Sequence, residues 1–272
     1  LCTYQQFYIY LWVQNVFKFK NMKKILLICI SLLLTISMQS QVTKTAAAGV
    51  NNWNNASSWS PSGVPASNDN ILVPAGAKMK VNVTGVTIDY FTISGGGELE
   101  VNNSISVTGG SASQVTGSSS TLSLKENMTI NGTSGVTVGS GASVTLTSGK
   151  QLILSNSSST LTNNGTITLN SSSSAFSSLL LRGDYDDNST GNVTYARYVS
   201  GISNDWDLIG SPMVGVTSNM IIAQSNLATQ GSDYAIGTFD NTTGANGTWS
   251  TFDSDDSFSE GQLESAKGFQ MA

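Results

Sequence analysis

Residues 122–130 read Leu-Ser-Leu-Lys-Glu-Asn-Met-Thr-Ile, which is two apolar–polar–apolar triplets joined by a short polar turn. Alternation with a period of two residues is typical of a half-buried β-strand, and each triplet is too short to be stable by itself. Such triplets recur from residue 81 to residue 169, set among Gly, Ser, Asn and Thr. This stretch therefore predicts many short strands separated by turns.

The spacing of the triplets indicates how these strands are arranged. One series of triplets is separated by 23, 22 and 23 residues, with starts at Leu99, Leu122, Val144 and Ile167. Two further series share nearly the same period, with starts at Val81, Ile105, Met128 and Leu152 and at Phe91, Val115, Val136 and Leu161. Three interleaved series predict an all-β chain, a right-handed parallel β-helix with three short strands per coil of about 23 residues. An antiparallel sandwich of hairpins is the alternative that the triplets alone leave open.

The third series also predicts a column of outward-facing threonines. Its members are Thr92, Thr116, Thr137 and Thr162. Stacked rungs would place their hydroxyls about 4.8 Å apart, where they could contact a sugar or ice. A flat binding array takes two such columns side by side, and the triplets show one. The alternative is that Thr is simply well tolerated on an exposed strand face.

Composition argues against several kinds of chemistry. The 272 residues include no histidine, the commonest general base and metal ligand, and only 11% of them are charged. Both cysteines, Cys2 and Cys29, precede the expected cleavage point of an export signal, so the mature chain has no thiol for disulfides, zinc or catalysis. Its net charge of about −9 does not suit binding to nucleic acid.

The N-terminal region has the plan of that export signal. Met22-Lys23-Lys24 precedes about 12 mostly apolar residues and a short polar exit. The apolar run is too short to span a bilayer. We expect a signal peptide at 22–41 with cleavage near Ser40, no transmembrane span in the mature chain, and a secreted or cell-surface location reached through the export machinery. Residues 1–21 precede a complete signal, so we interpret them as translated upstream sequence that is not structural.

An aromatic segment lies between the signal and the repeat. Trp53 and Trp59 are followed in order by Gly63-Val64-Pro65, Asp69-Asn70-Ile71 and Val73-Pro74-Ala75-Gly76. Over residues 50–108 this order resembles the opening of G8-type domains and of β-helical surface proteins exported by Bacteroidetes-like bacteria. The resemblance implies an adhesin-like surface protein in which this segment begins the solenoid and carries no catalytic residue. Two tryptophans beside the first rung can cap its apolar end; the alternative is that they stack on sugars.

The C-terminal part differs in composition, because acidic residues become frequent near residue 182. We expect a Trp-capped solenoid over 42–181 and an acidic, β-sandwich-like module over 182–272. Strands of this module are predicted at 192–199, 206–210, 234–239, 248–252 and 268–271.

The strand motifs of this part also resemble a segment of the same exported proteins. They are Asn192-Val193-Thr194-Tyr195, Trp206-Asp207-Leu208-Ile209-Gly210-Ser211-Pro212, Tyr234-Ala235-Ile236-Gly237 and Lys267-Gly268-Phe269-Gln270. In those proteins the segment precedes a sorting domain of the type IX secretion route, so the resemblance implies a cargo of that route. The chain stops directly after a strand pattern, and we therefore expect it to be a fragment of a longer product.

An acidic loop offers the one candidate for a metal site. Asp184, Asp186 and Asn188 place oxygen ligands at positions 1, 3 and 5 of a calcium-loop pattern. Ser189 stands at position 6, where Gly is required, and Tyr195 at position 12, where Glu is required. An EF-hand is therefore rejected, and a looser Ca²⁺ site is the only cofactor that the sequence offers.

Three functions stay open at this point. We expect a non-catalytic structural or adhesion protein of the cell surface, with surface glycans or other extracellular polymers as partners. A carbohydrate- or ice-binding module is the alternative, and it rests on Trp53, Trp59 and the threonine column. A β-helical polysaccharide lyase or hydrolase comes third. Such enzymes need paired carboxylates, or a basic residue beside calcium, and Glu98 and Glu100 share a strand face without an arginine.

Overall fold

The computed structural model describes residues 41–199, 207–210, 217–240, 248–253 and 268–271. The chain divides into two units, residues 1–42 and 43–272, and the fold described here belongs to the second. The expected upstream segment, and the expected signal peptide except for Gln41, lie outside the described residues.

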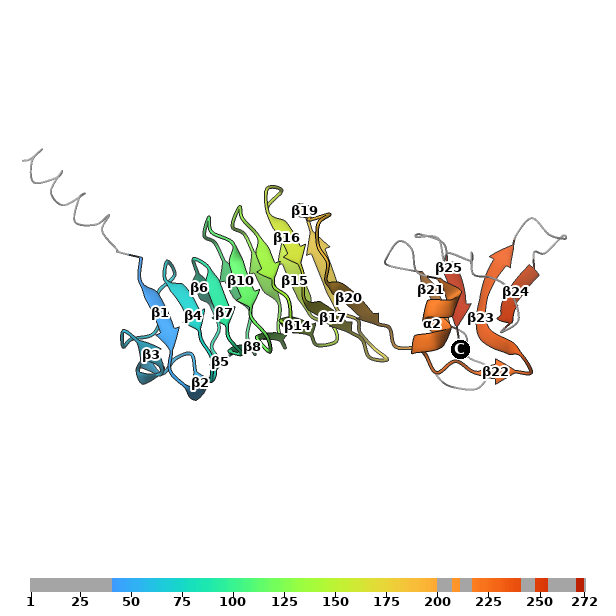
Figure 1. Cartoon of the computed structure of the whole chain (residues 1–272), viewed down its shortest axis with the longest axis horizontal. Coiled ribbons are helices and arrows are strands. Elements are labelled where there is room, and N and C mark those ends of the chain that lie inside the picture. Colours follow the sequence, from blue (N-terminus) through green and yellow to red (C-terminus); the bar gives the residue numbers. More distant parts are fainter. Residues whose placement is uncertain (1–40, 200–206, 211–216, 241–247, 254–267, 272) are drawn as a thin grey trace, which may run out of the picture. The chain divides into compact units, whose positions relative to one another are not determined.

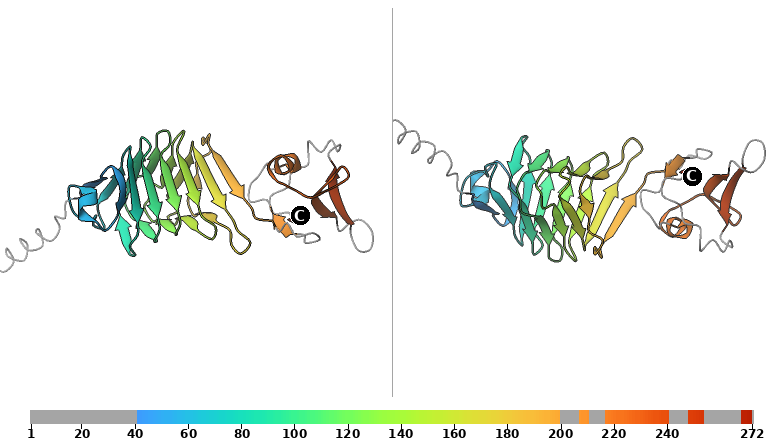
Figure 2. Two further views of the ribbon diagram at one scale, coloured as in Figure 1. Left: turned by 90° about the horizontal axis from the view of Figure 1, so that it is seen from below. Right: turned by 90° about the horizontal axis from the view of Figure 1, so that it is seen from above.

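Most of the described chain is a parallel β-solenoid of about seven turns with about 23 residues per turn, which confirms the predicted β-helix (Figure 1). Each strand pairs in parallel with the strand one coil later, and the chain visits three sheets, A, B and C, in that order. Figure 2 shows the resulting stack of rungs from two further sides. Parallel pairing throughout the repeat overturns the alternative of antiparallel hairpins.

The strands of each sheet come from successive coils. Sheet A contains β1 (Thr43–Ala46), β4 (Asn70–Val73), β7 (Phe91–Ser94), β10 (Ser113–Thr116), β13 (Val136–Val138), β16 (Thr160–Asn163) and β19 (Asp184–Tyr185). Sheet B contains β2 (Gly49–Asn52), β5 (Ala77–Val81), β8 (Glu98–Val101), β11 (Thr121–Leu124), β14 (Ser143–Leu146), β17 (Thr166–Asn170) and β20 (Asn192–Ala196). Sheet C contains β6 (Val86–Ile88), β9 (Ile105–Val107), β12 (Met128–Ile130), β15 (Gln151–Leu154) and β18 (Ser178–Leu181).

The core of the solenoid is made of inward-facing columns in which like side chains stack. In sheet B, one column aligns Leu99, Leu122, Val144 and Ile167, and all four side chains are fully buried. This is the series that the spacing predicted, and its register is confirmed. Burial of each such side chain stabilises the fold by about 1.5–3 kcal/mol. Since a single rung buries few of them, the stability of the solenoid comes from the contacts between stacked rungs.

The other two predicted series each contain one error of register. Val81 belongs to sheet B, where it pairs with Val101, and Val86 is the residue that pairs with Ile105 in sheet C. In sheet A, Val115 pairs with Ile93 rather than with Phe91. The physical reason for the second error is that a buried serine, Ser113, occupies the inward position that the pattern assigned to an apolar residue.

A cap closes the first rung. After β2 the chain forms residues 53–69 in place of a strand of sheet C, with a short 3₁₀ helix (η1, Ala56–Ser58) and β3 (Trp59–Ser60), which pairs antiparallel with β1. Trp53 and Trp59 are both buried, with 2% and 3% of their surfaces exposed. Lys44 lies at an inward position of β1, and its ammonium donates to the carbonyls of Pro61 and Ser62 at 3.1 and 3.3 Å. Both tryptophans belong to the buried core of the solenoid, as the cap interpretation requires.

The solenoid continues past the boundary expected at residue 182. β19 pairs in parallel with β16, and β20 pairs over five residues with β17, so both strands belong to the repeat. The buried Asn163 fastens this last coil, since its Nδ2 donates to the carbonyl of Asn192 at 3.2 Å and its Oδ1 accepts from the backbone of Gly165 at 3.2 Å. The rise in acidic residues near 182 thus does not mark a change of fold.

The C-terminal part contains an antiparallel sheet. Its strands are β21 (Asp207–Gly210), β22 (Thr229–Gln230), β23 (Asp233–Asp240), β24 (Thr248–Asp253) and β25 (Gly268–Met271). Four of these match predicted strands, whereas the helix α2 (Ser218–Gln224) was not predicted. The described residues of this part form one sheet and one helix rather than two packed sheets. Among the residues that the structure describes, no helix has the length and apolar character needed to cross a membrane.

Candidate functional site

The outer face of sheet B carries two registered columns of polar side chains. Each strand of sheet B from β8 to β20 has an outward residue before its first inward one, as in Thr121-Leu122-Ser123-Leu124, so at least two side chains per strand face outward. The first column consists of Val50, Lys78, Glu98, Thr121, Ser143, Thr166 and Asn192. The second column consists of Asn52, Lys80, Glu100, Ser123, Thr145, Thr168 and Thr194.

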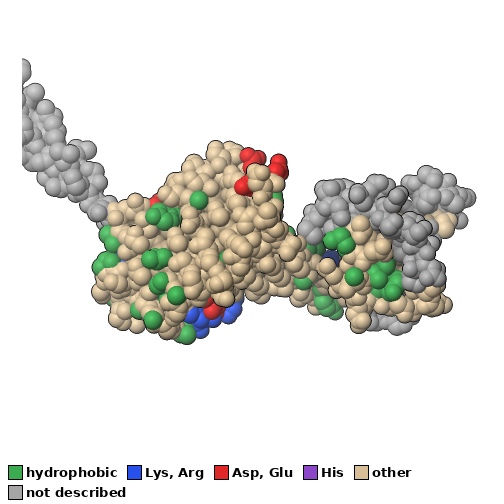
Figure 3. Space-filling view, in the orientation of Figure 1, with side chains coloured by type: hydrophobic (Ala, Val, Ile, Leu, Met, Phe, Trp, Pro, Cys, Tyr) green, Lys and Arg blue, Asp and Glu red, His purple; other side chains and the backbone are tan. Residues whose placement is uncertain are grey.

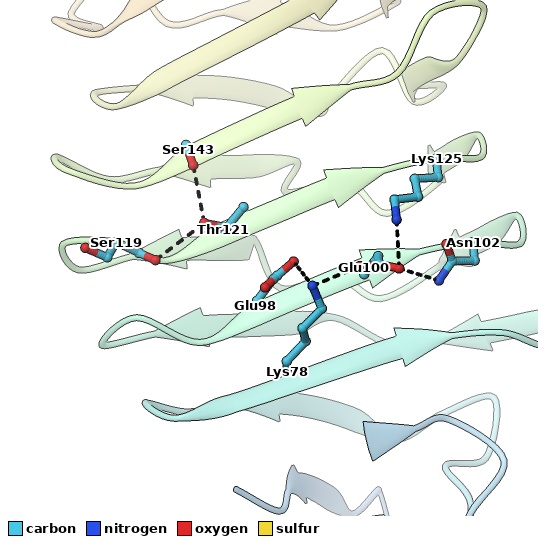
Figure 4. A network of polar contacts seen from close by, with 8 residues as sticks. All are labelled: Lys78, Glu98, Glu100, Asn102, Ser119, Thr121, Lys125 and Ser143. Carbon is cyan, nitrogen blue, oxygen red and sulfur yellow. Dashed lines mark hydrogen bonds and ion pairs between the residues drawn. The ribbon is translucent and has the colours of Figure 1, made fainter. Parts of the chain in front are cut away.

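The first rungs of this face hold a network of ion pairs (Figure 4). Lys78 Nζ lies 2.7 Å from Glu98 Oε1 and 3.0 Å from Glu100 Oε2, so one ammonium bridges both carboxylates. Glu100 Oε1 accepts from Lys125 Nζ at 3.0 Å and from Asn102 Nδ2 at 2.9 Å. In Figure 3, Lys and Arg side chains gather with acidic ones at the edge of the solenoid that carries β5 and β8, while most of the face in view is uncharged.

The network fixes the charge of its members. Burial alone would raise the pKa of Glu100, but the hydrogen bonds from Asn102, Lys125 and Lys78 outweigh it and lower the pKa from 4.5 to about 2. Hydrogen bonds to Glu98 and Glu100 raise the pKa of Lys78. A general acid must hold its proton near neutral pH, and Glu100 does not. The two glutamates that suggested a carboxylate pair are thus held together by a lysine instead.

The outward side chains on the later strands of the same face are uncharged, and in the two columns all but one of them are hydroxyls. We call the eight side chains that β11, β14, β17 and β20 contribute to the two columns the hydroxyl field: Thr121, Ser123, Ser143, Thr145, Thr166, Thr168, Asn192 and Thr194. This surface was not predicted, because each triplet begins at an apolar residue and leaves out the outward residue before it. Reading one residue further back, as in Thr166-Ile167-Thr168-Leu169, would have shown both columns.

The predicted threonine column lies on sheet A and is interrupted. Gln114, not Thr116, stands in register with Thr92 and Thr137, and Thr162 continues the column on the far side. Thr116 pairs with Ser94, two residues further along the strand. The reason is the shift of register at Ser113, which moves every side chain of β10 by two positions relative to the prediction. The structure therefore does not align these four threonines.

The two tryptophans proposed as sugar-binding residues are buried in the cap. Neither Trp53 nor Trp59 presents a ring face to solvent, and a buried ring cannot stack on a sugar. Their position favours the structural interpretation, in which they cover the apolar end of the first rung.

The acidic loop beside β19 is organised by its own hydrogen bonds. Asp186 Oδ1 accepts from the backbone and the side chain of Asn188 at 3.0 and 3.1 Å, and Asp186 Oδ2 accepts from Thr162 at 3.1 Å. These contacts lower the pKa of Asp186. Asp184 and Asn188 are exposed, and the described residues contain no group of three or more His, Cys, Asp or Glu side chains that could hold a metal ion. Asp186, the carboxylate best placed to bind calcium, therefore already accepts hydrogen bonds at both of its oxygens.

The fold and the faces of its sheets thus define the chain as a parallel β-solenoid. No protein-family model matches the chain, and neither curated proteins nor solved structures give a significant match to it.

Proposed function

We propose that this chain is an exported, non-catalytic β-solenoid with a structural or adhesive role at the cell surface. The observation that carries the proposal is the outer face of sheet B, where four successive rungs present a regular, uncharged set of seven hydroxyls and one amide. A long stack of rungs with a repeating outer face suits contact with extended partners rather than with one small molecule. We take those partners to be surface glycans or other extracellular polymers.

Features of the sequence support the same function. The segment from Met22 to Gln41 has the plan of an export signal, and the order of motifs around Trp53 and Trp59 resembles the opening of exported surface β-helices. The low charge and the absence of histidine in the chain agree with a role that needs no acid–base chemistry.

A carbohydrate- or ice-binding module is the second candidate, and the two-column hydroxyl field is the observation that favours it. The lyase or hydrolase hypothesis has less support. Its carboxylates, Glu98 and Glu100, are both paired with Lys78, at 2.7 and 3.0 Å. The low pKa of Glu100 leaves no proton for a leaving group at neutral pH.

Expression of the full chain in a bacterium that exports surface proteins tests the proposal. We expect the protein outside the cytoplasm with a new N-terminus near residue 41, attachment of the displaying cells to glycan-coated surfaces, and no release of soluble sugar from a panel of polysaccharides. Retention in the cytoplasm with an unprocessed N-terminus would contradict export. Release of sugar that the Glu98→Gln variant abolishes would contradict the non-catalytic role.

A further inference from the structure

We infer that the hydroxyl field of sheet B is a binding surface for an insoluble, uncharged polysaccharide whose chains lie extended and side by side. The inference deepens the proposed function, on which it rests, by naming the site and the chemical class of its partner. Figure 4 shows the edge of this surface, with Thr121 and Ser143 on neighbouring strands of the face that also carries Lys78 and Glu98.

Most hydroxyls of the field are available, unlike those at the corners of the coil. Ser123, Thr145, Thr166, Thr168 and Thr194 make no side-chain hydrogen bond to any described protein group. The Thr121 hydroxyl donates to the carbonyl of Ser119 at 3.4 Å and also lies 3.4 Å from the hydroxyl of Ser143. At the corners the hydroxyls of Ser120, Ser155 and Ser159 donate to backbone carbonyls, at 2.6, 3.2 and 2.7 Å. Corner hydroxyls thus connect parts of the coil, whereas five of the seven field hydroxyls have no described protein partner and can bond water or a ligand.

The field has the geometry of a lattice. Because β11, β14, β17 and β20 pair in register without offset, hydroxyls repeat along each column at about 4.8 Å, and the two columns lie about 6.6 Å apart along the strands. A partner whose own hydroxyls repeat in two directions can make the same contact at every rung. Each exchange of water for a ligand hydroxyl contributes little, so affinity must come from many simultaneous contacts. An ordered solid polymer provides them and a short soluble sugar does not.

The charge of the surface restricts the partner further. The outward positions of β11, β14, β17 and β20 contain no charged residue and no aromatic ring, while the charged residues Lys78, Lys80, Glu98 and Glu100 lie on the rungs before them. A cation next to the field, Lys125 directly after β11, is paired with Glu100 at 3.0 Å. Strand positions without cations do not attract sulfated or uronic polymers, and positions without rings do not hold a single sugar by stacking. The complement of this face is therefore a neutral polymer bound by its hydroxyls.

The mixture of residues favours a polysaccharide over ice. Ser123, Ser143 and Asn192 interrupt the threonines, so the field does not repeat one methyl and one hydroxyl at every position. Rotatable hydroxyls and an amide that both donates and accepts suit the varied hydroxyls of a polymer. Thr166, Asn192 and Thr194 are also the exposed members, which places the most accessible groups on the last two rungs.

Sedimentation of the purified full chain with microcrystalline cellulose and with chitin tests the inference. The double variant Thr145→Val/Thr168→Val removes two hydroxyls of one column and keeps the β-branched shape that strands favour. We expect its partition onto the polymer to fall about tenfold, the effect of losing two hydrogen bonds of ordinary strength. The matched control, Thr92→Val/Thr137→Val, makes the same change on the outer face of sheet A and should bind as the original chain does. Thermal melting of all three proteins verifies that each is folded.

The outcomes separate the inference from the function on which it rests. Equal binding by the two double variants would overturn the site while leaving surface adhesion intact. Attachment of displaying cells to glycan coatings without any binding to cellulose or chitin would overturn the polymer class. Adsorption of the chain to ice that the sheet B variant loses, with no binding to either polymer, would replace the polysaccharide by ice. Failure of the displaying cells to attach to any surface would contradict the proposed function itself.

Discussion

Trp53 and Trp59 pack edge to face in the cap, with ring centroids 5.0 Å apart and ring planes at 77° to each other. Trp59 Nε1 donates to the carbonyl of Trp53 at 2.9 Å, so the polar atom of one buried ring is satisfied by the backbone of the other residue. The backbone N–H of Trp53 in turn donates to the carbonyl of Lys80 at 2.9 Å, which joins the pair to sheet B. This arrangement closes the core where the first rung has no strand in sheet C.

Replacement of Trp59 by alanine should therefore destabilise the solenoid. We expect a loss of about 3–5 kcal/mol in the free energy of unfolding, because the substitution removes a buried ring and leaves a cavity beside Trp53. Trp59→Phe keeps most of the volume and loses mainly the hydrogen bond, about 1 kcal/mol. Urea denaturation followed by circular dichroism measures both. A Trp59→Ala variant as stable as the original chain would show that the ring does not cap the core.

The low pKa of Glu100 makes part of the stability dependent on pH. In the unfolded chain this carboxyl takes up its proton near 4.5, and in the folded chain it does so near 2. Its contribution is therefore fully present above 4.5 and is lost as the pH falls from 4.5 towards 2. We expect Glu100→Gln to cost about 1–3 kcal/mol at pH 7 and to flatten the curve of stability against pH in this window.

Urea titrations at pH 7, 4 and 3 measure this effect. Glu126→Gln is the matched control, because Glu126 pairs with Lys150 at 2.7 Å on a neighbouring turn and is more exposed than Glu100. We expect it to change stability by about 1 kcal/mol or less. If the two variants showed the same pH dependence, the network around Lys78 would not be the source of the shift.

The architecture could be predicted from the sequence because the core repeats. Leu99, Leu122, Val144 and Ile167 stack in register, and their nearly constant spacing reflects coils of nearly constant length. The errors arise where the spacing is not constant or the core is not apolar. Val86 and Ile105 are partners although they lie only 19 positions apart, because the second coil is short.

Ser113 shows why the threonine column was misplaced. It lies fully buried between Phe91 and Val136 in an inward column of sheet A, and its hydroxyl accepts from the backbone N–H of Phe91 at 3.3 Å. A hydrogen-bonded serine can thus replace an apolar residue in the core. The first apolar residue of the strand is then Val115, two residues after the true start of the register at Ser113. The hydroxyl field was missed for a different reason, since its first column lies outside the triplets altogether.

The acidic residues near 184 are the reason that a domain boundary was predicted at residue 182. Asp184 lies in the two-residue strand β19, which is exposed on both residues and so gives no period-two signal. Pairing with β16 nevertheless keeps it in the coil, and the next strand, β20, resumes the alternation with Val193 and Tyr195 inward. A change of surface composition therefore occurs here without a change of backbone path.

Close stacking of rungs makes Gly135 irreplaceable. Its φ is +81°, and a Cβ at this position would lie 1.9 Å from the carbonyl oxygen of Thr160 on the next coil. We expect Gly135→Ala to cost at least about 2 kcal/mol, from the left-handed backbone and from displacement of the neighbouring turn. Gly110→Ala is the control, because a Cβ there meets only Thr133 Oγ1, at 4.0 Å, and should change stability by about 0.5 kcal/mol or less. Thermal melting compares the two, and an equal effect would contradict the tight stacking at Gly135.

The loop at Asp186 predicts how the chain responds to calcium. Both oxygens of this carboxylate accept hydrogen bonds, Oδ1 from Asn188 and Oδ2 from Thr162, and an ion would have to break them. We therefore expect neither millimolar Ca²⁺ nor its removal with EDTA to change the melting temperature. Asp186→Ala should instead destabilise the last coil equally with and without calcium, because its role is to order the turn that leads into β20. A rise in melting temperature on adding Ca²⁺ that Asp186→Ala abolishes would show that Asp184, Asp186 and Asn188 form a calcium site after all.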